Sequence, residues 1–194
     1  MEPTSTLMPA AAGNKTRWNY AFGWSIFDSM QEGQSLDFER LKCYSLFGGI
    51  TRETFETIRP LIHIENYVAG EDVVKEGTLN DRIYLICSGS VEILKHVLGK
   101  DTGACRRITV MHTGDTFGEM ELIDTQPCAA TVRACEDTRT LTLTNQDLYK
   151  VSKIDMKAYA LLIMNLAREL SRRLRVMDEM LGGERPSVSI TIRD

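Results

Sequence analysis

Short runs of β-branched and aromatic residues, separated by glycines, fill the middle of the chain between residues 66 and 143. Runs such as RIYLICSG, SVEILKHVL and TRTLTLT have the length and composition of strands. Four glycines stand where such runs end, at positions typical of turns that need a positive φ: Gly70, Gly77, Gly89 and Gly114. The spacing predicts an antiparallel roll or barrel of many short strands.

The segments on either side of this β-rich stretch have the patterns of helices. One helix is expected near Leu36 to Ser45, and a second from Thr51, a favourable N-cap residue, to about Leu61. After the strands, Thr144 can cap a short helix over NQDLYKVSK. A long helix is expected from Ile154 or Met156 to the glycines at 182 and 183, which end it.

The segment FGEMELID, residues 117–124, interrupts the β pattern. It has the length of a single helical turn with its loop. A short helix inside a β-roll places unpaired backbone N–H groups where an anion can bind, so we expect an anion site here.

The long helix carries a second pattern, a series of apolar residues separated alternately by four and three positions. The series is Ile163, Ala167, Leu170, Leu174, Met177 and Leu181. This is the a/d spacing of a coiled-coil seam. Either residues 156–181 form the seam of a homodimer, or the helix packs along its own domain; the first is favoured because a small roll rarely offers a groove for so long a helix.

The chain ends are expected to lie outside the roll. Residues 1–17 are polar and small, as in a mobile tail, and WNYAFGWSIFDSM crowds aromatic residues into an extended strip that docks onto its own domain, a dimer mate or another protein. Four parts follow: residues 1–34 as tail and aromatic docking segment, 35–152 as the roll with flanking helices, 153–183 as the long helix and 184–194 as a C-terminal tail.

Composition restricts the class of protein. The 194 residues are 43% hydrophobic and 26% charged, which is typical of one folded domain with appendages. The net charge of -4 provides no overall basic field, so no nucleic acid partner is expected.

The sequence shows no apolar run long enough to span a membrane and no signal peptide, which indicates a cytoplasmic protein. Five cysteines without a CxxC pair argue against a disulfide framework.

Motifs of catalysis and metal binding are not recognised in the sequence. The three histidines, His63, His96 and His112, lack HxxxH or HExxH spacing, so no metal site is expected. No Ser/His/Asp arrangement, GxSxG elbow or P-loop is present either. The expected protein is not an enzyme and needs no cofactor.

Several motifs taken together resemble the cyclic nucleotide-binding domain family: LFGGIT, YVAGEDVVKEG, DRIYLICSGSVEIL, GDTFGEMELID and PCAATVRA. The resemblance runs from about Leu46 to Leu181. It implies a mainly β fold with flanking helices, a double-stranded β-helix of jelly-roll type, with a phosphate-binding cassette and a long C-terminal helix. It also implies a bacterial regulatory protein of signal transduction with a protein effector. Since about a dozen residues follow Leu181, a DNA-binding domain is not expected.

The resemblance assigns the cassette residue by residue. The positions that match are Phe117, Gly118, Glu119, Met120, Leu122, Pro127, Ala129, Ala130 and Thr131. By resemblance, Glu119 accepts a hydrogen bond from the ribose 2′-hydroxyl, and backbone N–H groups from Gly118 to Leu122 hold the cyclic phosphate. Ala129 would favour cAMP.

Two positions depart from the family pattern, and both weaken phosphate binding. Cys128 stands where the family has an arginine that pairs with the phosphate, and Glu121 replaces a small residue. Arg133, Arg168 or Arg172 could supply the missing cation, although surface arginines are more often solvated or ion-paired. The ligand could also be a different nucleotide. The Cys128 thiol is either a redox sensor with a lowered pKa or a small buried hydrophobe.

The sequence is therefore compatible with two functions. The chain is a sensor that binds a cyclic nucleotide, cAMP above others, in a cassette without the usual arginine. Alternatively, it is a degenerate dimeric adaptor that binds no nucleotide, with an empty pocket or one filled by its own tail, SVSITIRD.

Overall fold

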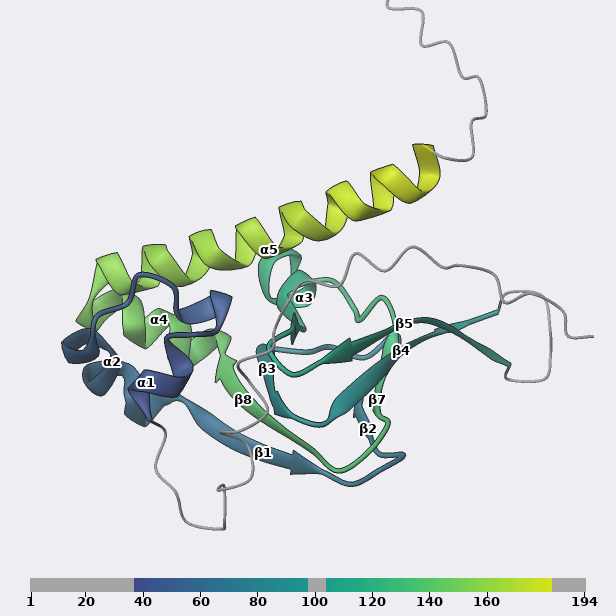
Figure 1. Ribbon diagram of the computed structural model, residues 1–194, viewed down its shortest axis with the longest axis horizontal. Helices are drawn as coiled ribbons and strands as arrows, with labels where there is room; N and C mark the ends of the chain where they lie inside the picture. The colour runs from purple at the N-terminus through teal and green to yellow at the C-terminus, as the bar shows by residue number, and fades with distance from the viewer. Residues whose placement is uncertain (1–36, 98–103, 183–194) are drawn as a thin grey trace, which may run out of the picture. The chain divides into compact units, whose positions relative to one another are not determined.

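Eight short strands form the β-roll in the described part of the chain. The computed structural model describes residues 37–97 and 104–182 (Figure 1). The strands are β1 (His63–Tyr67), β2 (Asp72–Val74), β3 (Arg82–Ser88), β4 (Ser90–His96), β5 (Cys105–His112), β6 (Thr116–Phe117), β7 (Thr131–Ala134) and β8 (Thr138–Thr144). They pair antiparallel in two four-stranded sheets, β1-β8-β3-β6 and β2-β7-β4-β5. The predicted fold class is confirmed.

Helices lie before, within and after the strands. They are α1 (Phe38–Leu41), η2 (Ser45–Phe47), α2 (Arg52–Ile58), η3 (Arg59–Leu61), α3 (Glu119–Asp124), α4 (Asn145–Ile154) and α5 (Met156–Gly182). The first predicted helix is shorter than expected and continues as the separate 3₁₀ turn η2. The second changes to 3₁₀ geometry at η3, because Pro60 has no N–H to continue an α-helix.

The aromatic strip, most of the loop between β4 and β5, and the C-terminal tail lie outside the described residues. Their predicted roles therefore stay predictions.

Strand β3 separates two apolar cores. Ile83, Leu85 and Cys87 point to one side, where they pack with residues of the helices, among them Phe55 and Leu162. Tyr84 and Ile86 point to the other side, into the roll, where they pack with residues such as Val91 and Phe117. The unbroken apolar run of this strand is explained by burial on both of its faces.

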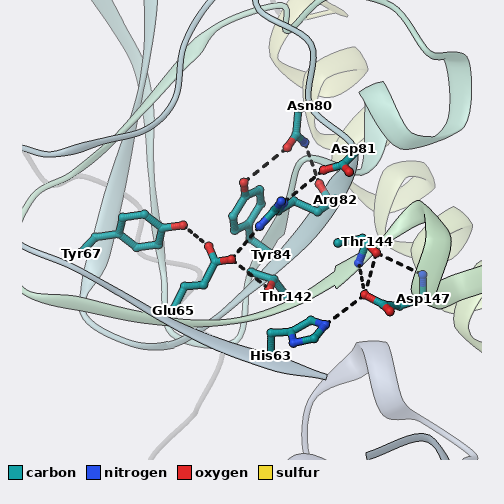
Figure 2. A network of polar contacts seen from close by, with 10 residues as sticks. All are labelled: His63, Glu65, Tyr67, Asn80, Asp81, Arg82, Tyr84, Thr142, Thr144 and Asp147. Atoms are coloured by element: carbon teal, nitrogen blue, oxygen red, sulfur yellow. Dashed lines mark hydrogen bonds and ion pairs between the residues drawn. The ribbon is translucent and has the colours of Figure 1, made fainter. Parts of the chain in front are cut away.

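Helix α4 begins in a capping box. The Thr144 hydroxyl accepts a hydrogen bond from the Asp147 backbone N–H at 3.1 Å, and the Asp147 carboxylate accepts one from the Thr144 N–H at 3.3 Å. His63 on β1 lies 3.1 Å from the same carboxylate (Figure 2). Burial acts to raise the pKa of Asp147, but hydrogen bonds from Thr144 and Lys150 outweigh it and hold this pKa below its ordinary value.

Helix α5 runs from the helical end of the roll past α3 (Figure 1). Its first turn is capped by Asp155, whose Oδ1 accepts hydrogen bonds from the backbone N–H groups of residues 157 and 158. One face of its first half is buried, through Ala158, Leu162, Asn165 and Leu166. The Asn165 amide holds the helix to the η2 segment by donating to the carbonyls of Leu46 and Gly48.

Candidate ligand-binding site

The candidate site is the segment that joins β6 to β7 through α3. Gly118 precedes α3 with a φ of 81°. A Cβ atom at this position would lie 2.6 Å from the Arg82 carbonyl oxygen and 3.0 Å from the ring of Tyr84. The missing side chain therefore lets the segment lie directly against the start of β3.

The start of β3 is held in place by a polar network (Figure 2). Asn80 donates to the Arg82 carbonyl at 2.6 Å and accepts from the Tyr84 hydroxyl at 3.3 Å. The Arg82 guanidinium donates to Glu65 of β1 at 2.7 Å, and Glu65 also accepts from the Tyr67 hydroxyl. Burial raises the pKa of Tyr84 to about 12, so the phenol remains a neutral donor. The network gives the cassette a rigid support.

Glu119, the first residue of α3, is buried and joined to the long helix. Its side chain is 3% exposed, and its Oε1 accepts a hydrogen bond from Arg173 Nη1 of α5 at 2.6 Å. Arg173 also donates to the carbonyl of Thr116. Within the described residues, Glu119 Oε2 is buried and has no hydrogen-bond partner. Burial raises the pKa of Glu119 above its ordinary value, and the positive charge of Arg173 offsets this only in part.

Glu121 reaches across the cassette to the segment before β7. Its Oε1 accepts a hydrogen bond from the backbone N–H of Ala129 at 3.3 Å. Ala129 directly follows Cys128, the position of the missing arginine. The Glu121 carboxylate thus engages the Ala129 N–H, a backbone donor next to the position where the family has an arginine.

Cys128 is a buried residue of the roll interior. It is 3% exposed, and its backbone bonds to the segment before β3, through Thr78 O and Gly77 N, both at 2.8 Å. Burial, with a smaller contribution from the Glu121 carboxylate, raises the pKa of the Cys128 thiol. The redox hypothesis, which needs a lowered pKa, is wrong for this environment, whereas the buried-hydrophobe alternative agrees with it.

The other cassette residues divide between packing and exposure. Phe117 stacks on Tyr84, with 4.6 Å between the ring centroids. Leu122 packs against the core beneath the helices. Met120 and Ala129 are exposed, and Ala130 is half-buried.

The three arginines proposed to replace the missing cation have other partners. Arg133 donates to Asp72 at 2.6 Å, Arg168 to Asn165 at 2.9 Å, and Arg172 to Glu169. The arginine that reaches the cassette is Arg173, which is not among the three arginines expected from the sequence.

Helical periodicity provides a signal for Arg173 in retrospect. The buried face of α5, formed by Leu162 and Leu166, continues at about 3.6 residues per turn through Glu169 to Arg173. Charged residues that extend a buried face indicate a buried ion pair.

Residues 37–97 and 104–182 contain no group of three or more His, Cys, Asp or Glu side chains that could hold a metal ion. No helix among these residues is long and apolar enough to cross a membrane.

Residues 64–155 match the family model described as cyclic nucleotide-binding domain. The chain is 32% identical over 139 residues to the cyclic AMP receptor protein of Thermus thermophilus, covering 71% of this chain and 61% of that protein. It is 26% identical over 121 residues to a cAMP-dependent protein kinase regulatory subunit of Dictyostelium discoideum, covering 62% and 37%. The chain thus spans less than two thirds of each of these relatives.

Solved structures show the same fold. The catabolite activator protein of Thermus thermophilus superposes with a TM-score of 0.61 at 31% identity, covering 71% of this chain and 62% of that one. A cyclic nucleotide-binding domain from Methylobacillus flagellatus gives a TM-score of 0.68 at 22% identity, covering 78% and 84%. At the second identity the likeness concerns the fold alone.

Proposed function

We propose that this chain, which belongs to the cyclic nucleotide-binding domain family, is a regulatory module that binds the ribose of its ligand at Glu119 and reports occupancy through α5. The ion pair between Glu119 and Arg173 carries this proposal. The carboxylate that is expected to accept the ribose hydroxyl is bonded directly to the long helix. A ligand that competes for Glu119 therefore changes how α5 is held.

The first ligand to test is cAMP. The family resemblance implies a cyclic nucleotide, and Ala129 stands at the position that accompanies a preference for cAMP. The curated relatives described above are named as a receptor and a regulatory subunit, which supports a regulatory role rather than an enzymatic one.

Helix α5 is also the proposed homodimer seam. From Leu174 onward its apolar residues are exposed, with Leu174, Met177 and Leu181 each more than half exposed. These residues belong to the a/d series and lie in the second half of α5, beyond Ala158, Leu162, Asn165 and Leu166, which are buried in the domain. A second copy of the chain would cover them, and a protein effector would respond to the position of α5.

The test is a calorimetric titration of the full chain with cAMP and then cGMP, extended to millimolar ligand. We expect saturable binding that the change Glu119→Gln weakens at least about tenfold, because the ribose loses a charged acceptor. Trypsin cleavage within α5 should change when ligand is bound. In Arg173→Met, cleavage should no longer respond to ligand, while Arg172→Met, the adjacent arginine that pairs with Glu169, should behave like the original chain.

A second candidate function is an adaptor that binds no nucleotide. It is favoured by one observation: the chain's own side chains engage both the Glu119 carboxylate and the Ala129 N–H. A flat calorimetric trace at millimolar ligand, in the original chain and in Arg173→Met, would support the adaptor and contradict the sensor. If the C-terminal tail fills the pocket, deletion of residues 184–194 would restore binding.

A further inference from the structure

The charge balance of the cassette is unusual for a site that takes a phosphate. Two carboxylates, Glu119 and Glu121, lie on the first turn of α3. Cys128 contributes a thiol that its raised pKa keeps neutral. Arg173, the cation that contacts Glu119, is already paired with that carboxylate. The Glu121 carboxylate therefore has no counter-charge from the described contacts, and an entering phosphate would meet a like charge.

Other cations on the neighbouring strands have acceptors of their own. Lys95 pairs with Glu76 and bonds the Ala129 carbonyl, not its N–H side. Arg133 and Arg107 pair with Asp72 and Glu92. The described contacts thus provide no charged replacement for the family arginine.

The side chains of the site, Glu119 and Glu121, provide hydrogen-bond acceptors. Glu119 Oε2 is a buried acceptor that lacks a donor, which is a costly arrangement unless a ligand supplies one. Glu121 uses one oxygen for Ala129, and a carboxylate can accept about four hydrogen bonds. The Ala129 N–H, a donor that a phosphate could use, is already engaged. These two carboxylates therefore favour a ligand that donates hydrogen bonds to them.

Ribose chemistry distinguishes two ligands by this criterion. A 3′,5′-cyclic nucleotide keeps a single ribose hydroxyl, because its 3′ and 5′ oxygens are esterified, and its phosphate only accepts hydrogen bonds. The parent nucleoside has no charge and three hydroxyl donors. One carboxylate can accept the single ribose hydroxyl of a cyclic nucleotide. A second carboxylate finds further hydroxyl donors only on the nucleoside.

We infer that the cassette binds an uncharged ribonucleoside in preference to its cyclic phosphate, with Glu119 and Glu121 both accepting from ribose hydroxyls. The inference rests on the proposed function, since it places a different ligand in the same site. Because Glu119 Oε2 is buried, a covering side chain must move before a hydroxyl reaches it. Glu121 is then the residue that determines the class of ligand, and Glu119 the residue that recognises ribose.

The experiment compares adenosine and guanosine with cAMP and cGMP by calorimetry on the full chain. We expect at least one nucleoside to bind about tenfold or more tightly than its own cyclic phosphate. The 2′-deoxy form of that nucleoside should bind at least about tenfold more weakly.

Variants locate the cause of this preference. Glu121→Gln keeps an acceptor for Ala129 but removes the charge, so it should reduce the preference for the nucleoside at least about fivefold. The double variant Glu121→Gln, Cys128→Arg should reverse the preference, so that the cyclic phosphate binds more tightly than the nucleoside. Asp124→Asn, which removes a charge from the exposed end of the same helix, should leave the preference unchanged. Thermal melting of each variant shows whether it is folded.

The outcomes separate the two proposals. Tighter binding of a cyclic nucleotide than of its parent nucleoside would overturn the inference and leave the sensor function intact. Absence of saturable binding for all four compounds would overturn the sensor function itself. An unchanged preference in folded Glu121→Gln, or the same change in Asp124→Asn, would overturn the role given to Glu121.

Discussion

Gly118 and Gly77 share a backbone conformation but differ in their surroundings. Their φ angles are 81° and 80°. A Cβ atom at Gly118 would collide with the Arg82 carbonyl, whereas at Gly77 it would meet nothing within 4 Å. Gly77→Ala should therefore cost about 1 kcal/mol through its φ alone, and Gly118→Ala about 1 to 3 kcal/mol more. Urea unfolding of both variants measures the difference, and equal costs would contradict the close approach.

The pairing of Glu119 with Arg173 predicts a pH-dependent variant. Arg173→Met leaves a buried carboxylate without its cation, which should lower the free energy of unfolding at pH 7 by about 1 to 3 kcal/mol, a range reduced because Arg173 is partly exposed. Since the pKa of Glu119 is raised in the folded chain, its ionisation opposes folding as pH rises.

The loss of free energy of unfolding in Arg173→Met should therefore be complete above the pKa that Glu119 has in the folded chain. It should disappear below about pH 4, where Glu119 is protonated in the folded and the unfolded chain. Urea unfolding between pH 4 and 8 measures it. The double variant Glu119→Gln, Arg173→Met should recover most of the loss at pH 7. A deficit independent of pH would mean that Arg173 acts through packing alone.

At the scale of the element, α5 presents one face to the domain and another to solvent. Residues two apart on a helix point about 160° away from each other. Leu174, in the a/d series, and Val176 are such a pair, and both are exposed. Leu174→Asp should therefore convert a dimer to a monomer, and Val176→Asp should not. Sedimentation equilibrium at several concentrations tests this, and a monomeric original chain would contradict the seam.

The capping box of α4 makes a second prediction at this scale. Asp147→Asn removes the charge that Thr144, Lys150 and His63 surround, so it should cost about 0.5 to 2 kcal/mol at pH 7. Because the pKa of Asp147 is lowered on folding, this contribution is present above the unfolded value near 4 and is lost as pH falls below it. Thermal unfolding at pH 7 and below pH 4 should show the difference between the two proteins shrinking.

For the whole molecule, local sequence signals predicted the strands and most helices. Glycines at strand ends and the Thr51 and Thr144 caps act within a few residues, so they can be read without the tertiary structure. The first helix was predicted too long because Phe38 and Leu41 pack against the α2 region over a single turn. Tertiary packing, not local propensity, determines that length.

The site was predicted less completely than the fold. Resemblance identified Glu119, Glu121 and Cys128, but not what each side chain contacts. Arg173 lies 54 residues from its partner Glu119. The three arginines expected to reach the phosphate, Arg133, Arg168 and Arg172, bond to other residues. Which of several like residues reaches a carboxylate depends on the rotation of α5, which the packing of Asn165 and Leu166 fixes. No local pattern contains that information.

Strand β3, with one face in each apolar core, has a consequence for how the molecule opens. Neither core can lose its packing while β3 stays in place, so the two should unfold as one cooperative unit. In native-state hydrogen exchange, the central amides of β3 should exchange only through global unfolding. Those of β1, an edge strand with exposed residues, should exchange through smaller fluctuations at lower free energy.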